Sequence, residues 1–405
     1  MPYCALLDNH LCKRVNGGVI PCCINTMEDR NFQSWDELKN SFQYLDIVEE
    51  MKDGWHETCK KCEFNEKQGD TSYRQWANGE VKKGHWIHGK LSHIEMSLSN
   101  QCNFACRMCG PISSTTWGKL IIDNAQEIEL HEKKWYLGPL NDAPSRHYRM
   151  ENLKVNTKRI ENLRLTNHKK NLKTMRDLLD PHDLSNLKFF KMLGGEPFLS
   201  AEIDMMFDYL KERGVDLSKM GFTCNTNASL FPKASIRELL KELEYVNIMF
   251  SLDGIGKSLE YSREGANWQT IKDNIWKWHD FQKTWDDGPM PGQLRFAVHC
   301  VVNVWSLSAL DDLEKWSKCM GFKIHYDFAA ESSPEQTVNA LPPDYINTLK
   351  IPKEVHFKEY YRFDSLSFEK FKSATELWDK VNGKHMKDYL PDLADYVYGN
   401  NTSTP

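Results

Sequence analysis

The feature that most constrains the fold is a regular alternation of strand-length and helix-length segments in the middle of the chain. Six short segments have strand character: 91–98, 187–193, 219–224, 245–252, 294–302 and 322–328. Amphipathic stretches of helical length lie between most of them, at 201–213, 233–243, 268–284 and 307–320. Six strand–helix units of this kind predict an α/β protein with a parallel sheet and right-handed crossovers.

Two further regions flank this alternation. Residues 1–85 have the pattern of a small irregular unit, with a turn at Gly17–Gly18 and helical apolar spacing over 34–51. After the last predicted strand the chain is punctuated by proline and rich in aromatic residues, which predicts short packed helices. We therefore expect three regions, 1–85, 86–330 and a C-terminal helical extension over 331–405.

Composition excludes several classes of protein. The chain has 405 residues, 40% of them hydrophobic, which is enough to bury a core and excludes a wholly disordered chain. No stretch approaches the roughly 20 apolar residues of a membrane-spanning helix, and the N-terminus lacks the pattern of a signal peptide. A net charge of −5 argues against a general nucleic-acid coat. We expect a cytoplasmic protein that makes no membrane contact.

Twelve cysteines are unusual for such a chain, and nine of them lie in the first 109 residues. Disulfide scaffolds are short and secreted, whereas clustered cysteines in a long cytosolic chain more often bind metal. Two tight clusters occur, Cys59-x2-Cys62 and Cys102-x3-Cys106-x2-Cys109. Both are therefore predicted to be metal ligands.

The second cluster lies in a loop that follows the first predicted strand. Three thiolates in one loop can ligate three corners of a cubane iron–sulfur cluster, whereas a structural cluster or zinc site uses four ligands. No fourth cysteine or histidine lies within 102–109. One iron would then be open to bind a substrate or cofactor directly.

The C-x3-C-x2-C spacing resembles that of the radical S-adenosylmethionine (SAM) enzymes. Four further elements of that family occur in order, each after a predicted strand: Gly194-Gly195-Glu196-Pro197, Cys224-Asn225-Thr226-Asn227, Ser251-Leu252-Asp253-Gly254 with Arg263, and Asn303. The resemblance implies a partial (βα)6 TIM-type barrel with its site at the carboxyl ends of the strands. It also implies SAM as a cofactor and a site-differentiated 4Fe-4S cluster held by Cys102, Cys106 and Cys109.

The resemblance also implies a role for each element. The Gly194–Pro197 element would hold the methionine amino group, with Glu196 as the acceptor and the two glycines allowing close approach. Asn225 would lie near the ribose, and the S-x-D-G…R pattern implies that Ser251 and Arg263 contact the methionine carboxylate.

Two more positions belong to the same implied pocket. Asn303 matches the polar residue expected near the adenosine. The position before the third cysteine is often aromatic in the family and stacks on adenine, but here it is Met108. Taken singly, these motifs could be turns, helix N-caps or loop caps. Their order and the cysteine triplet favour the radical-SAM interpretation over a structural zinc site.

The N-terminal cysteines resemble the ligand set of a twitch domain, the single-cluster form of the auxiliary SPASM unit. The match covers Cys4, Cys22, Cys59 and Cys62, with Gly17 before and Gly69 after them. This unit usually follows the barrel, and N-terminal versions resemble a group that includes phage-encoded proteins. Four thiolates would close a second, auxiliary 4Fe-4S cluster, and zinc is the alternative occupant.

The remaining cysteines have no assigned chemistry. Cys23 could replace Cys22 as a ligand, and Cys12 could replace Cys4, although the strand-like neighbours of Cys12 suit a buried thiol. Cys300 and Cys319 are predicted core residues. Cys224 is predicted to be a core residue as well, or a hydrogen donor in the site.

The family resemblance implies reductive cleavage of SAM to a 5′-deoxyadenosyl radical, which abstracts hydrogen from a substrate. Twitch and SPASM units usually accompany peptide or protein substrates, and a nucleotide or other small molecule is the alternative. A cellular reductant such as flavodoxin or ferredoxin would supply the electron. The non-enzyme alternative is an iron–sulfur or zinc regulatory protein that needs no SAM pocket.

One spacer is unusually long and basic. Within an insertion at about 120–180, residues 144–176 carry ten lysines and arginines against Glu151 and Glu161. This pattern is typical of a solvated helical surface. The alternative is a binding surface for an anionic partner, either nucleic acid or an acidic peptide.

Overall fold

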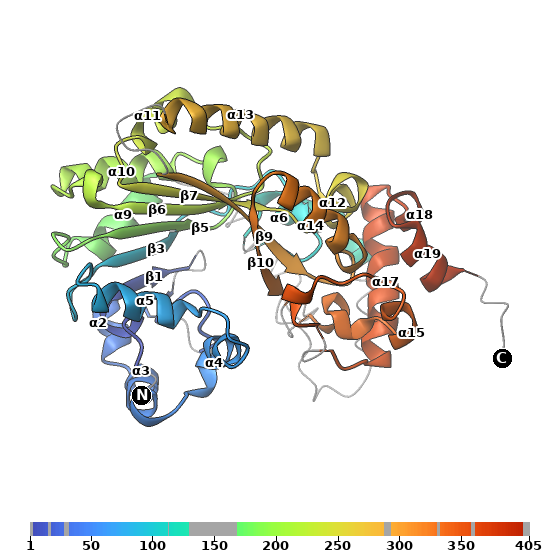
Figure 1. Ribbon diagram of the computed structural model, residues 1–405, viewed down its shortest axis with the longest axis horizontal. Helices are drawn as coiled ribbons and strands as arrows, with labels where there is room; N and C mark the ends of the chain where they lie inside the picture. Colours follow the sequence, from blue (N-terminus) through green and yellow to red (C-terminus); the bar gives the residue numbers. More distant parts are fainter. Residues whose placement is uncertain are drawn as a thin grey trace.

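An eight-stranded sheet forms the centre of the computed structural model (Figure 1). The structure describes residues 3–14, 18–27, 32–111, 113–128, 168–286, 293–329, 333–357 and 361–399. The strand order is β10-β9-β7-β6-β5-β3-β1-β2, and every neighbouring pair is parallel except β1 with β2. The predicted α/β class with a mostly parallel sheet is confirmed.

Six of the strands are those that the sequence predicts. They are β3 (His93–Ser97), β5 (Phe189–Leu193), β6 (Gly221–Thr226), β7 (Tyr245–Ser251), β9 (Leu294–Val302) and β10 (Lys323–Phe328). They lie side by side in chain order, and each end is within two residues of the prediction. Their short apolar cores define them well because both faces of a parallel sheet are covered.

Helices cover one face of this sheet. They include α9 (His168–Leu179), α10 (Glu202–Glu212), α11 (Ala234–Leu240), α13 (Trp268–Asp286) and α14 (Leu310–Cys319). In Figure 1, α10, α11 and α13 lie along the same side of the strands. The Phe207 ring of α10 contacts those of Phe190 and Phe222, with centroids 5.7 and 5.3 Å apart. Alternate strand residues therefore form an apolar layer beneath these helices.

The N-terminal unit adds two strands to the same sheet. Its elements are α1 (Leu6–Asn9), β1 (His10–Lys13), β2 (Val19–Ile20), α2 (Trp35–Lys39), α3 (Phe42–Asp53), α4 (Lys60–Lys67) and α5 (Tyr73–Lys82). β1 pairs in parallel with β3. The stretch with helical apolar spacing over 34–51 forms two helices, because Ser34 and Ser41 each cap the start of a separate helix.

The C-terminal helices pack at one end of the sheet, to the right in Figure 1. They are α15 (Pro343–Ile346), α17 (Ser365–Asn382), α18 (Met386–Tyr389) and α19 (Pro391–Tyr398). Trp378 of α17 packs edge-on against Trp117 of α6 (Thr115–Asp123), with ring centroids 4.6 Å apart. The extension therefore contacts the helix that follows the cysteine loop.

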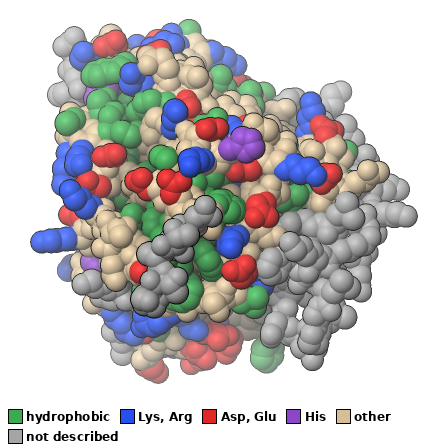
Figure 2. Space-filling model, turned by 90° about the vertical axis from the view of Figure 1, so that its right-hand side faces the viewer, with side chains coloured by type: hydrophobic (Ala, Val, Ile, Leu, Met, Phe, Trp, Pro, Cys, Tyr) green, Lys and Arg blue, Asp and Glu red, His purple; other side chains and the backbone are tan. Residues whose placement is uncertain are grey.

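Acidic and basic side chains are interspersed on the described part of the face seen in Figure 2. No helix among the described residues has the length and apolarity to cross a membrane. Most of the basic segment 144–176 lies outside the described residues, so its predicted role is not tested. Of its side chains, Lys173 is exposed and Arg176 donates to Glu212, with Nη1 and Oε1 3.0 Å apart.

Candidate functional site

The predicted motifs come together at one edge of the sheet. The carboxyl ends of parallel strands share an edge, and five of these ends carry the motifs. After β3 comes the cysteine loop, after β5 the Gly194–Pro197 element, in β6 Asn225, at the end of β7 Ser251, and after β9 Asn303.

A short antiparallel ladder holds the cysteine loop. β4 (Ala105–Cys106) pairs with β8 (Arg263–Glu264), so that Cys106 lies opposite Arg263. The carbonyl of Cys106 accepts a hydrogen bond from Trp117 Nε1 at 2.7 Å, and that of Cys102 accepts one from Thr116 Oγ1 at 2.7 Å. Hydrogen bonds to the backbone carbonyls thus hold the loop in place, and the thiols remain available to bind a metal centre.

The three thiols of this loop influence one another electrostatically; Cys106 is buried, and Cys102 and Cys109 are half-buried. Burial raises the pKa of Cys102, Cys106 and Cys109 to about 12, and each thiolate raises the pKa of a neighbour. Ligation to a metal centre displaces the thiol protons and removes the cost of a buried thiolate. This set of three soft donors fits an iron–sulfur cluster with one iron left without a protein ligand.

Two nitrogen donors approach the thiols. Arg263 Nη1 lies 3.8 Å from Cys106 Sγ, and Asn227 Nδ2 lies 3.9 Å from Cys102 Sγ. Hydrogen bonds to cluster sulfurs are among the groups that set a cluster's reduction potential. Asn227 is two residues beyond the predicted Asn225 and was not predicted to contact the loop.

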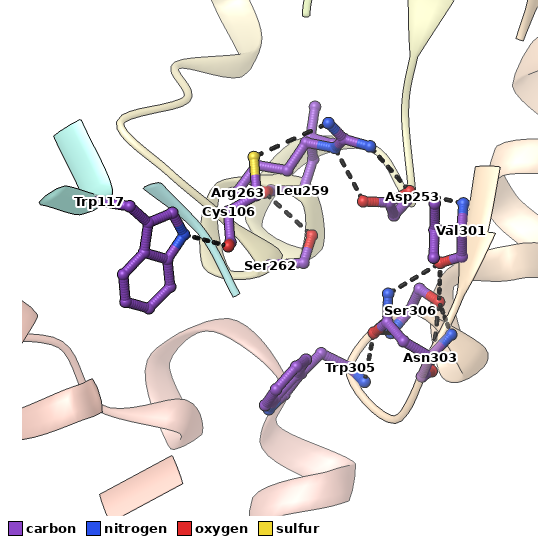
Figure 3. Close-up of polar contacts among 10 residues, drawn as sticks. All are labelled: Cys106, Trp117, Asp253, Leu259, Ser262, Arg263, Val301, Asn303, Trp305 and Ser306. Atoms are coloured by element: carbon purple, nitrogen blue, oxygen red, sulfur yellow. Dashed lines mark hydrogen bonds and ion pairs between the residues drawn. The ribbon is translucent and has the colours of Figure 1, made fainter. Parts of the chain in front are cut away.

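Arg263 is anchored by Asp253, as Figure 3 shows. Arg263 Nε lies 2.8 Å from Asp253 Oδ2, and Nη2 donates to Oδ1 at 3.0 Å. Oδ1 also accepts the backbone N–H of Val301 on β9 at 2.8 Å. Both side chains of this two-point ion pair are buried, so Asp253 fixes the direction of the guanidinium.

The two glycines after β5 allow the chain to approach the start of the cysteine loop. A Cβ on Gly195 would lie 1.9 Å from the carbonyl oxygen of Gln101, and Gly194 has φ +97°. The N–H of Glu196 donates to the same carbonyl at 2.6 Å. The two glycines were predicted to allow the backbone to approach a ligand closely, but in the structure they allow it to approach the backbone of Gln101. A pocket of about 210 Å³ lies beside it, lined by Gly194, Gly195, Glu196 and Pro197 among others.

Glu196 is fully buried and accepts three hydrogen bonds. Oε1 accepts from Thr226 Oγ1 at 2.7 Å and from the N–H of Phe198 at 3.2 Å, and Oε2 accepts from the N–H of Asn227 at 2.7 Å. Burial raises its pKa to about 7, although these hydrogen bonds act in the opposite direction. Each carboxylate oxygen has two acceptor positions, so one position remains for an ammonium group.

The remaining predicted residues have different surroundings. Asn303 Oδ1 accepts the N–H groups of Trp305 and Ser306 at 2.9 and 3.0 Å, so its side chain caps the turn after β9 (Figure 3). The side chains of three others are half-buried around the same edge: Met108, Asn225 and Ser251.

The four N-terminal cysteines share one pocket. Cys4, Cys22, Cys59 and Cys62 all line a pocket of about 420 Å³, although they come from three separate segments of the N-terminal unit. Burial raises the pKa of each thiol, and the charges of Cys59 and Cys62 raise that of Cys4 further. Four soft donors around one pocket fit a closed cluster or a zinc ion equally well.

The spare cysteines of this unit lie apart from that lining. Cys23 Sγ lies 3.7 Å from Lys191 Nζ, and Cys12 is fully buried on β1 as predicted. Gly17, which was matched to the twitch pattern, lies outside the described residues.

Sequence reasoning missed Arg107, which lies between Cys106 and Cys109 in the chain. Its side chain is 2% exposed, and Nη2 donates to Asp379 Oδ1 of α17 at 2.6 Å. Its guanidinium lies 3.8 Å from the ring centroid of Tyr261. The C-terminal extension therefore holds the cysteine loop through a buried ion pair, and the charge within C-x3-C-x2-C was the available signal.

The comparisons with known proteins give remote structural matches. The model is similar to anSMEcpe with bound AdoMet (18% identity, TM-score 0.32, 77% of this chain and 68% of that chain). It is also similar to Streptococcus suis SuiB bound to S-adenosylmethionine, with 15% identity and a TM-score of 0.33 over 69% of this chain and 54% of that chain. A third match is anSMEcpe with AdoMet and the Cp18Cys peptide, with 18% identity and a TM-score of 0.31 over 77% of this chain and 67% of that chain. The chain thus spans about half the length of SuiB. No family model matches it, and no curated protein does.

Proposed function

We propose that this chain is a radical SAM enzyme whose six strands from β3 to β10 form a partial (βα)6 barrel. The observation that carries the proposal is the convergence of three thiols with Arg263 and Glu196 at one sheet edge. These groups offer soft donors for iron, a guanidinium and an acceptor for an ammonium within one site. A regulatory iron–sulfur or zinc protein would need the thiols but would have no need of Arg263 and Glu196 beside them.

A cluster held by these thiols would supply the electron for reductive cleavage of SAM to methionine and a 5′-deoxyadenosyl radical, and hydrogen abstraction from the substrate would convert that radical to 5′-deoxyadenosine. The residues of the chain would bind the cluster and SAM and orient them relative to the substrate. Cys102, Cys106 and Cys109 would hold the cluster, and Glu196 would accept the methionine ammonium. Asp253 would fix Arg263 beside the site, where the guanidinium favours negative charge on the thiolates or on a carboxylate.

We propose that the pocket of Cys4, Cys22, Cys59 and Cys62 holds a second, auxiliary 4Fe-4S cluster. Four thiols leave no iron free for SAM, so this cluster would carry electrons. For the substrate we propose a peptide or protein side chain, on the resemblance to twitch-containing enzymes, and a flavodoxin or ferredoxin as reductant. Clusters of this kind are sensitive to oxygen, which favours the cytoplasm.

The test is anaerobic reconstitution with iron and sulfide, followed by dithionite and SAM. Wild type should produce 5′-deoxyadenosine, and Cys102→Ala should lose at least 100-fold of the yield. Cys319 was predicted to be a core residue but is exposed at the end of α14, so Cys319→Ala removes an exposed thiol outside the site and should behave as wild type. No 5′-deoxyadenosine from wild type, or an undiminished yield from Cys102→Ala, would contradict the proposal.

A further inference from the structure

We propose a third metal site, built by His10 and Cys12 of β1 and Glu95 of β3, which binds a divalent ion such as zinc. The site goes beyond the proposed function, since none of these residues belongs to the cysteine loop or lines the four-thiol pocket. In the register of the two strands, Cys12 lies opposite Glu95 and His10 opposite His93. Because alternate strand residues share a face, all of these side chains lie on the face away from α10.

The three ligand atoms are close enough together for one metal ion to lie among them. His10 Nε2, Cys12 Sγ and a carboxylate oxygen of Glu95 all lie within 4.8 Å of one another, and the three residues are at most 1% exposed. His10 Nε2 and Glu95 Oε2 are 3.4 Å apart. Two ligand atoms that are each about 2.1 Å from a tetrahedral zinc ion lie about 3.4 Å apart, so this separation fits.

The hydrogen bond on the far side of the imidazole selects the tautomer that a metal needs. His10 Nδ1 lies 3.0 Å from the carbonyl oxygen of Pro21, and a carbonyl only accepts, so Nδ1 carries the proton. In the neutral ring, Nε2 then has a lone pair that points at the carboxylate. Metal-ligating histidines are held in this way by a partner on the other nitrogen.

The facing atoms need a cation between them. His10 Nε2 and Glu95 Oε2 are buried and neither has a hydrogen-bond partner, whereas Glu95 Oε1 is paired with Lys191. A charge-assisted hydrogen bond from a protonated imidazole is usually 2.7–2.9 Å long, shorter than the 3.4 Å observed. A metal ion bound by both atoms satisfies them at the observed distance.

Lys191 supports the carboxylate without occupying the ligand position. Its Nζ lies 2.9 Å from Glu95 Oε1, while Oε2 faces the histidine. Glu95 would therefore ligate through Oε2 alone and stay oriented through Oε1, as ligating carboxylates usually are. The set of one imidazole, one thiolate and one carboxylate suits zinc, which accepts all three donor types.

The experiment measures zinc and iron per chain in full-length protein, equilibrated in a zinc buffer under anaerobic conditions. Wild type should hold one more zinc than Cys12→Ala and Glu95→Gln, with iron unchanged in both variants. Cys300→Ala removes another fully buried thiol and should keep the wild-type zinc content. Because the readout is zinc rather than SAM cleavage, the result is independent of whether the proposed enzyme activity exists.

Equal zinc in wild type and in both variants overturns the site. If the variants fail to fold, anomalous diffraction at the zinc edge from wild-type crystals decides instead. A peak within bonding distance of His10 Nε2 and Cys12 Sγ supports the proposal, and no peak there overturns it.

Discussion

The cysteine loop at the sheet edge and the four-thiol pocket of the N-terminal unit differ in more than the number of thiols. The loop takes its three cysteines from eight consecutive residues, and the guanidinium of Arg263, which is paired with Asp253, approaches the sulfur of Cys106. The pocket gathers its cysteines from three segments and is lined largely by apolar side chains, including Leu6, Ile24, Met51 and Trp55, although Lys61 and Arg74 line it as well.

The two sites show how cysteine sulfur can be placed either in an open site, which binds a further ligand, or in a closed site, which does not. A site that binds a further ligand needs a missing thiol and polar groups around the gap, whereas a closed site needs only enclosure. The loop meets the first requirement and the pocket meets the second. This contrast can be tested by changes that affect one site and spare the other.

The largest expected effect is on SAM cleavage, which should depend on the cysteine loop much more than on the four-thiol pocket. Cys106→Ala should reduce SAM cleavage by dithionite-reduced protein at least 100-fold, because the proposed cluster beside Arg263 would lose a ligand. Cys62→Ala should lose about as much iron but keep SAM cleavage within about threefold of wild type. The measurements are iron content and the yield of 5′-deoxyadenosine without substrate. Equal loss of cleavage in both variants would remove the functional distinction.

The next effect tests how the loop is held. Asp379→Ala should destabilise the protein by about 3–5 kcal/mol, because it leaves the buried Arg107 charge unpaired. It also removes an acceptor from Tyr261 Oη and from the N–H of Met386, each at 2.7 Å. Urea unfolding gives the cost, and iron content should fall at the cysteine loop only.

Asp395→Ala is the matched control for this change. It breaks the Lys387–Asp395 pair in the same C-terminal extension, where both side chains are well exposed, so at most about 1 kcal/mol should be lost. A cost for Asp379→Ala no larger than that of the control would show that the extension does not hold the loop.

The smallest effect concerns pH. The pKa of Glu196 is about 7 in the folded protein and ordinarily 4.5, so the folded state keeps a proton that the unfolded chain loses between these values. Unfolding then releases a proton, and the free energy of unfolding falls by about 3 kcal/mol as pH rises from 4.5 to 7. The fall should be absent in Glu196→Gln, as urea titrations at several pH values would measure. The same slope in wild type and variant would contradict it.

Much of the fold follows from local sequence. The six parallel strands could be predicted because each is a short apolar run bounded by turns and separated from the next by a helix-length segment. The pairing of β1 with β3 could not, because β1 is four residues long and its partner lies about 80 residues away. The β4–β8 ladder was missed for the same reason.

The site divides in a similar way. Cys102, Glu196 and Arg263 are predicted as site residues from their spacing and order along the chain. The partners that orient them, such as Asn227 and Asp379, are set by contacts across more than 100 residues, which periodicity does not report. His10 and Cys12 occupy alternate positions of one strand, and this signal has meaning only once the register places Glu95 beside them.

The parallel pairing of β1 with β3 has a consequence for any attempt to divide the protein. Four residues of β1, His10–Lys13, cover the side of β3 that β5 does not. Removing the N-terminal unit would leave β3 as an edge strand with unsatisfied N–H and C=O groups, a template on which copies of the truncated chain could add to one another. The N-terminal unit thus also protects the edge of β3 from intermolecular pairing, and a chain without this unit is expected to be insoluble.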